Sequence, residues 1–166
     1  MMLAQSSDAA FWLMLAALPI ALWVVLSDLR SMRIPNAAVL ALIAVYALVG
    51  LATLPLPAWG WGWAHFAVVL VIGFVLSLTG GFGAGDAKFA AAMAPFVALG
   101  DARLFLVLLA TVALAGFVTH RLARRVALVR AQTPDWESWE RAEFPMGLAL
   151  GPALIFYLAL ASIYGS

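Results

Sequence analysis

The sequence predicts an all-α integral membrane protein, a bundle of six transmembrane helices in a single domain covering residues 1–166. Hydrophobic residues make up 66% of the chain, well above the roughly 45 to 50% of ordinary soluble domains. Mean hydropathy is +1.07, and the 10% of residues that are charged gather between long apolar runs. Once these runs are assigned to the membrane, no segment is left for a separate soluble domain.

The first apolar run predicts a helix over about 9–26, followed by a short polar turn at 27–36. No Lys or Arg precedes this run, which is typical of a retained spanning helix and not of a signal peptide. Pro35 suits the first turn of the next helix, expected over about 37–54.

Three tryptophans, Trp59, Trp61 and Trp63, follow the second run and are expected to form an interfacial loop, 58–63. The run 89–99 is too short to cross a hydrocarbon core of about 30 Å, so its helix is expected to begin at Asp86. A tight polar turn is expected at 100–103, and a basic helical segment at 121–130. The remaining transmembrane helices are predicted over about 64–79, 86–99, 104–119 and 145–163.

The positive charges predict the orientation of the bundle. With six spans, eight of the nine basic residues share one side, and only Arg103 lies on the other. That side is expected to be cytoplasmic, with both termini outside. The eight residues are Arg30, Arg33, Lys88, Arg121, Arg124, Arg125, Arg130 and Arg141.

The segment 80–88 combines four glycines with Asp86 between two apolar runs. A carboxylate at membrane level is costly and often marks a functional path, whereas glycine allows another backbone to approach closely. Asp28 ends the first helix and Asp86 begins the fourth, so both emerge on the cytoplasmic side. Two carboxylates from distant segments are therefore expected to meet there.

The composition excludes several other chemistries. The chain has no cysteine, and neither His65 nor His120 has a metal-ligand partner at useful spacing, so neither a metal nor a cofactor is expected. A net charge of +1 argues against a nucleic-acid partner. Two neighbouring carboxylates that share a proton can activate a water and protonate a leaving group, which is the chemistry of aspartic proteolysis.

Three motifs together resemble those of prepilin leader peptidases, a family of bacterial intramembrane aspartic proteases of the Gly-x-Gly-Asp type. They are Asp28 before Ile34-Pro35-Asn36, the stretch Gly83-Ala84-Gly85-Asp86-Ala87-Lys88, and Pro145-Met146-Gly147. The resemblance implies a six-helix enzyme of the inner membrane that removes a short basic leader from type IV pilin or pseudopilin precursors at the cytoplasmic face. It also implies that Asp28 and Asp86 are the catalytic pair.

Longer members of that family carry a cysteine-rich zinc-binding region and also methylate the new pilin amino terminus. This chain has no cysteine and no room for such a region, which puts N-methyltransferase activity in doubt. Its compact plan is similar to the tight-adherence (Flp) pilus branch or to archaeal preflagellin peptidases, of which we favour the Flp branch.

Further residues are expected to bind substrate or shape the site: Gly83, Gly85, Lys88, Pro35, Asn36 and Pro145. Gly83 and Gly85 would let the substrate backbone pass near Asp86, while Gly80 and Gly81 are expected to form a turn. A weaker hypothesis gives four acidic residues a role in attracting the basic leader: Asp135, Glu137, Glu140 and Glu143.

Simpler roles remain open for the same residues. Asp28 could pair with Arg30 or Arg33, Asp86 could cap a helix, and Lys88 could extend to the lipid head groups. The histidines are expected at the membrane interface. At the level of function, the alternative is a non-catalytic subunit of a pilus or secretion assembly. A transporter is disfavoured, because neither an internal repeat nor mid-membrane charges are found.

Overall fold

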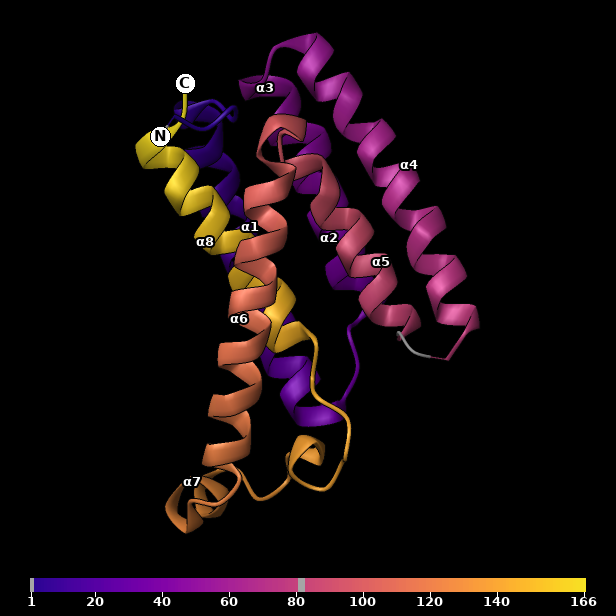
Figure 1. The fold of residues 1–166 in the computed structure, drawn as a ribbon, viewed down its shortest axis with the longest axis vertical. Coiled ribbons are helices and arrows are strands. Elements are labelled where there is room, and N and C mark those ends of the chain that lie inside the picture. The colour runs from indigo at the N-terminus through magenta and orange to yellow at the C-terminus, as the bar shows by residue number, and fades with distance from the viewer. Residues whose placement is uncertain (1, 81–82) are drawn as a thin grey trace.

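The protein is a bundle of helices joined by short turns (Figure 1). The computed structural model describes residues 2–80 and 83–166. Its helices are α1 (Ser7–Ser31), α2 (Asn36–Val45), α3 (Leu51–Thr53), α4 (Leu56–Leu78), α5 (Ala84–Met93), α6 (Ala102–Ala123), α7 (Ala127–Gln132) and α8 (Gly147–Tyr164). A π-helical turn, Tyr46–Gly50, joins α2 to α3, and 3-10 turns lie at Ala94–Phe96, Leu99–Asp101 and Glu137–Trp139.

The predicted all-α, multi-pass architecture is confirmed, with one difference in the number of long helices. In the described residues, five segments are long and apolar enough to cross a membrane: Ser7–Ser31, Asn36–Thr53, Leu56–Leu78, Leu99–Ala123 and Gly147–Tyr164. The expected fourth helix, 86–99, is instead the 10-residue α5 followed by 3-10 turns. Pro95 explains the early end, because proline lacks the N–H that an α-helix needs and clashes with the preceding turn.

The tryptophan-rich segment 58–63 is helical, so the prediction of a loop there is wrong. Helix α4 begins at Leu56, directly after Pro55. Tyr46 packs against Gly62 of α4, where any side chain would collide with the phenol. The Tyr46 hydroxyl donates to the carbonyl of Trp59 at 2.9 Å. These contacts hold the tryptophan segment against the bundle as the first turns of a helix.

Helices α1 and α8 form the centre of the bundle, and small residues bring them close together. A Cβ at Gly151 would lie 3.0 Å from the carbonyl oxygen of Ala21. Both chain ends lie together at one end of the bundle (Figure 1), where the Leu3 N–H donates to the Tyr164 carbonyl at 2.8 Å. The opposite end carries the end of α1, the start of α5 and α7.

Several helix ends differ from the predictions by a few residues. Helix α1 continues to Ser31, so Asp28 lies in its last turn and the connection to α2 is shorter than expected. Met32 then ends α1 in the left-handed conformation, with φ of 51°. The expected turn 100–103 is partly helical because α6 begins at Ala102, and the basic segment 121–130 is divided between the end of α6 and α7.

Asp101 connects three segments at the end of the bundle that holds both chain termini. Its buried carboxylate accepts three hydrogen bonds. The backbone N–H groups of Ala4 and Gln5 donate at 2.9 and 3.0 Å, and the Tyr157 hydroxyl donates at 2.9 Å. This carboxylate therefore joins the first residues of the chain to the start of α6 and to α8. A buried carboxylate satisfied by several donors is typical of a structural role.

Candidate active site

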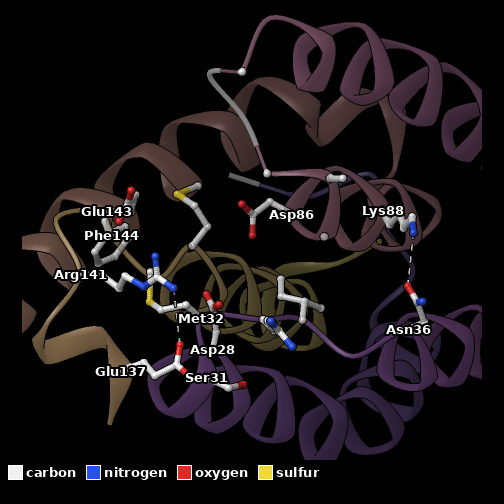
Figure 2. A pocket seen from close by; sticks show the side chains of 17 residues that line it. Asp28, Ser31, Met32, Asn36, Asp86, Lys88, Glu137, Arg141, Glu143 and Phe144 are labelled. Carbon is white, nitrogen blue, oxygen red and sulfur yellow. Dashed lines mark hydrogen bonds and ion pairs between the residues drawn. The ribbon is translucent and has the colours of Figure 1, made fainter.

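A cavity of about 820 Å³ opens at the end of the bundle opposite the chain termini. Figure 2 shows Asp28 and Asp86 facing this cavity from opposite sides. Two carboxylates from distant helices thus line one cavity at the same end of the bundle. The lining residues come from α1, the α1–α2 turn, the start of α5 and the segment before α8, and they include Ser31, Met32, Arg33, Ile34, Asn36, Gly83, Gly85, Lys88, Glu137, Arg141, Glu143 and Met146.

Asp28 is held by the first residue of α8. Its side chain is only 4% exposed, and the Gly147 N–H donates to Asp28 Oδ2 at 2.7 Å. Because the first N–H groups of a helix have no partner within the helix, this contact gives the Gly147 N–H the acceptor that it would otherwise lack. Asp28 therefore bonds to α8, and the described residues show no ion pair between it and Arg30 or Arg33.

Only glycine fits at position 147 without displacing Asp28. A Cβ there would lie 2.9 Å from Asp28 Cβ, 3.1 Å from Asp28 Oδ2 and 3.1 Å from Val24 Cγ1. The Asp28 carboxylate is thus fixed between its own helix and the start of α8. Pro145, which is fully buried two residues earlier, sets the path of the chain into this helix.

Asp86 lies in the first turn of α5, outside the five long apolar helices. Gly83, not Asp86, occupies the N-cap position of α5. Burial raises the pKa of Asp86 to about 6, the negative charge of Asp28 adds to this rise, and the Gly83 N–H opposes it. The two carboxyl groups are therefore electrostatically coupled, and Asp86 keeps its proton up to a pH of about 6.

Close packing of α5 against its neighbours fixes the position of Asp86. A Cβ at Gly73 of α4 would lie 3.0 Å from Ala87 Cβ, so these helices are in near contact beside the carboxylate. A Cβ at Gly83 would lie 2.5 Å from Asp86 Oδ2, whereas one at Gly85 would only touch Ile34 at 3.6 Å. Gly83 is the glycine whose missing side chain leaves room for Asp86.

The other predicted site residues lie around the same cavity or behind it. Lys88 Nζ donates to Asn36 Oδ1 at 3.4 Å on one side of the carboxylates (Figure 2). Pro35 is the N-cap residue of α2, and it supports Asn36 from outside the cavity lining. Gly80 adopts a φ of +75° and forms the expected turn, while Gly81 lies outside the described residues.

The segment between α7 and α8 closes the other side of the cavity. Figure 2 shows Glu137, Arg141 and Glu143 there, with Arg141 Nη2 4.0 Å from Glu137 Oε2. Of the four acidic residues proposed to attract a basic leader, only Glu137 and Glu143 line the cavity. Glu140 pairs instead with Arg130 at 3.2 Å.

Comparison with known protein families shows which family the chain belongs to. The model of the type IV leader peptidase family matches residues 13–119, which include both Asp28 and Asp86. The chain belongs to the type IV leader peptidase family. Comparisons of the chain with curated proteins and with solved structures gave no match.

Two residues on which this fold depends are not identified by the sequence pattern. Gly147 belongs to the motif Pro145-Met146-Gly147, but nothing in its local sequence indicates that its N–H reaches Asp28. Asp101 was assigned to a polar turn, although it is 5% exposed and joins three segments. The available signal was that Asp101 is the one acidic residue between two long apolar runs, which could have indicated a buried structural carboxylate.

His120 also differs from its expected place at the membrane interface. It is 3% exposed, and its ring stacks on Trp139 with centroids 4.9 Å apart. This contact packs the 3-10 turn that carries Glu137 against the end of α6, so His120 supports one wall of the cavity. In residues 2–80 and 83–166, no three His, Cys, Asp or Glu side chains are grouped as metal ligands would be.

Proposed function

We propose that this member of the type IV leader peptidase family is an aspartic endopeptidase whose catalytic residues are Asp28 and Asp86. The observation that carries the proposal is the placement of both carboxyl groups on one cavity, with the pKa of Asp86 raised to about 6 by burial and by Asp28. A coupled pair of this kind holds one proton over a range of pH, so it offers a base and an acid at once.

The surroundings of the two residues suggest different roles. Asp28 Oδ2 accepts the N–H of Gly147 at the start of an 18-residue helix, so this oxygen acts as a hydrogen-bond acceptor and does not carry the shared proton. Asp86 has the Asp28 charge nearby and favours its protonated form. We therefore assign Asp28 as the general base and Asp86 as the general acid.

In the proposed reaction, Asp28 accepts a proton from a water as that water attacks the carbonyl carbon of the scissile peptide bond. Asp86 donates its proton to the carbonyl oxygen, which gives a neutral tetrahedral intermediate. When the carbon–nitrogen bond breaks, the proton held by Asp28 passes to the departing nitrogen, and Asp86 regains a proton from the collapsing hydroxyl. The products are a carboxyl group and an amine, and both aspartates return to their initial states.

The proposed substrate is a type IV pilin or pseudopilin precursor, with Flp-type precursors favoured by the compact plan of the chain. Its short basic leader would enter the cavity, where Glu137 and Glu143 are available to attract it. Gly83 and Gly85 would shape the path of the substrate backbone beside Asp86, and Lys88 with Asn36 would contact the other side of the cut. N-methyltransferase activity is not part of the proposal.

In the proposed membrane arrangement, residues 1–166 form a single domain of the bacterial inner membrane with the cavity at the cytoplasmic face. The short α5 and the turns after it return the chain from the cavity end to the terminal end, completing six passes. Both termini would lie in the periplasm, because the basic residues concentrate at the cavity end.

Labelling of introduced sites checks this topology. A tag after Ser166 is expected to react with a membrane-impermeant reagent added to intact spheroplasts, whereas a tag between Asp135 and Glu143 is expected to react only after lysis. Reaction of the second tag from outside intact spheroplasts would reverse the orientation and move the cavity to the periplasmic face.

Co-expression with small pilin precursors tests the activity directly. We expect wild-type enzyme to shorten the precursor by its leader, as measured by mass spectrometry of the pilin amino terminus. The same mass decides whether a methyl group is added. If several precursors keep their leaders although the protein is confirmed in the membrane, the chain would instead be an assembly subunit.

The rate of leader removal is expected to fall as the pH rises above about 6. Asp86 must carry a proton to act as the acid, and the pKa of Asp86 near 6 means that this proton is lost as the pH passes that value. Below the optimum, protonation of the base lowers the rate, which gives a bell-shaped profile of kcat/KM. If the chemical step limits the rate, a profile that stays flat from about pH 5 to about pH 9 would contradict the coupled pair.

A further inference from the structure

A second hollow lies on the side of the bundle, between α4 and α6, and Asp86 stands beyond one of its ends. It has a volume of about 490 Å³, and its lining is apolar apart from the rings of Trp61 and His65. Val68 and Val69 of α4 form one wall, and Leu106 and Leu109 of α6 form the other. Ala90, Met93 and Ala94 form the floor, and we call this hollow the lateral groove.

The floor of the lateral groove continues the face of α5 that carries Asp86. Ala90 and Met93 follow Asp86 by four and seven residues, so the three share one side of the helix. At 1.5 Å per residue, Ala90 lies about 6 Å along the helix axis from Asp86. A helix that lies on this floor parallel to α5 would therefore have one end near the proposed acid.

The walls of the lateral groove carry many side chains that the rest of the protein leaves exposed. Helix α6 buries only His120 among its own residues, and α4 buries only Gly62 and Gly73. Val68 is 56% exposed and Leu106 is 63% exposed, although both face the groove. The alanines of the floor allow a partner backbone to approach closely, as small residues do between membrane helices.

We propose that the lateral groove binds the apolar helix of the precursor substrate, so that α4 and α6 flank this helix and α5 delivers its end to Asp86. This inference rests on the proposed function and adds the docking surface. The occupant it names is a membrane helix that bears a basic leader, because the groove is apolar and its continuation along α5 leads to the cavity that holds the acidic pair. A bound lipid chain is the competing occupant.

Disulfide mapping tests the docking surface, since the chain contains no cysteine of its own. Single cysteines are introduced at Val68 and at Leu106 in an Asp86→Asn background, which keeps the precursor uncleaved. The matched control is Leu22→Cys on α1, which is 55% exposed but lies outside the groove. The partner is a pilin precursor with single cysteines scanned along its apolar helix.

Val68→Cys and Leu106→Cys are expected to crosslink at substrate positions that repeat every three to four residues, about tenfold more than Leu22→Cys. Equal crosslinking from Leu22→Cys would overturn the proposal. Each groove cysteine is also made in enzyme that retains Asp86, called its active parent. If an active parent cleaves the precursor but the corresponding Asp86→Asn variant forms no crosslink, the proposal is overturned as well. If the active parents fail to cleave while the wild type cleaves, the cysteines disrupt the enzyme. The Ala90→Leu variant then decides whether the precursor docks in the lateral groove. Failure of the wild type to cleave contradicts the proposed function itself and this inference with it.

Ala90→Leu fills the floor of the lateral groove and gives an independent kinetic measurement. We expect KM for the precursor to rise about tenfold with kcat nearly unchanged, because lost docking weakens binding of substrate and transition state alike. Ala110→Leu, an exposed change on α6 outside the groove lining, is expected to leave both constants near wild type. A fall in kcat with unchanged KM in Ala90→Leu would contradict docking in the groove.

Discussion

Asp86→Asn is expected to lower leader removal by at least about 10³-fold while leaving the protein folded in the membrane. The amide keeps nearly the shape of the carboxyl group but has no acidic proton to donate, and general acid–base groups contribute roughly 10² to 10⁴ in rate. The measurement is the fraction of precursor that has lost its leader after co-expression and after incubation with purified enzyme.

Asp28→Asn is expected to have an effect of similar size, because the amide cannot accept the proton of the attacking water. Asp8→Asn is the matched control, since Asp8 lies on the same helix but in its first turn, far from the cavity. We expect Asp8→Asn to cleave at the wild-type rate. Near-normal cleavage by either purified variant, Asp28→Asn or Asp86→Asn, would remove that residue from the catalytic pair.

Thermal unfolding separates loss of chemistry from loss of fold in Asp86→Asn. The raised pKa of Asp86 means that the folded protein binds this proton more tightly than the unfolded chain does, so its stability falls as the pH rises from about 4 to about 6. Above pH 6 the folded protein carries this penalty in full, and the neutral amide removes it. The variant is therefore expected to be more stable than wild type at pH 8, by on the order of 1 kcal/mol, and least different at low pH.

The pair of aspartates was predictable from the sequence, because each feature needed for the prediction is local. Apolar runs locate the helices, and the number of spans between Asp28 and Asp86 places both residues at the same end of the bundle. Whether the two residues are catalytic stays a prediction, since the family match concerns the chain as a whole.

The parts that could not be predicted depend on contacts between distant segments. The tryptophans of 58–63 suggest an interfacial loop, yet the contact of Tyr46 with Gly62 places them in a helix. Similarly, the bond from Gly147 to Asp28 joins residues far apart in the sequence, and no local pattern encodes it. The early end of α5 is different, because Pro95 is a local signal for it in the sequence.

Gly147→Ala is expected to lower the rate of leader removal about 100-fold, through displacement of Asp28. The added methyl group would stand 2.9 Å from Asp28 Cβ and 3.1 Å from Asp28 Oδ2, so the carboxylate must move from the N–H that holds it. A shift of about 1 Å in a catalytic group can cost a factor of this size. Gly151→Ala is the matched control, because its methyl group meets Ala21 of the same α1–α8 contact one turn further on.

Both variants are expected to lose stability through overpacking, by about 1 to 3 kcal/mol each, so the unfolding temperature alone does not distinguish them. The dependence of kcat/KM on pH distinguishes the two variants. If Gly147 keeps Asp28 ionised, then in Gly147→Ala the acid-side limb of the kcat/KM profile moves to higher pH, because the ionised base has lost its donor. In Gly151→Ala this limb stays where it is in the wild type. Equal losses of activity with unshifted profiles would mean that Gly147 serves only the packing of α8 on α1, and the assignment of Asp28 as the base would lose its support.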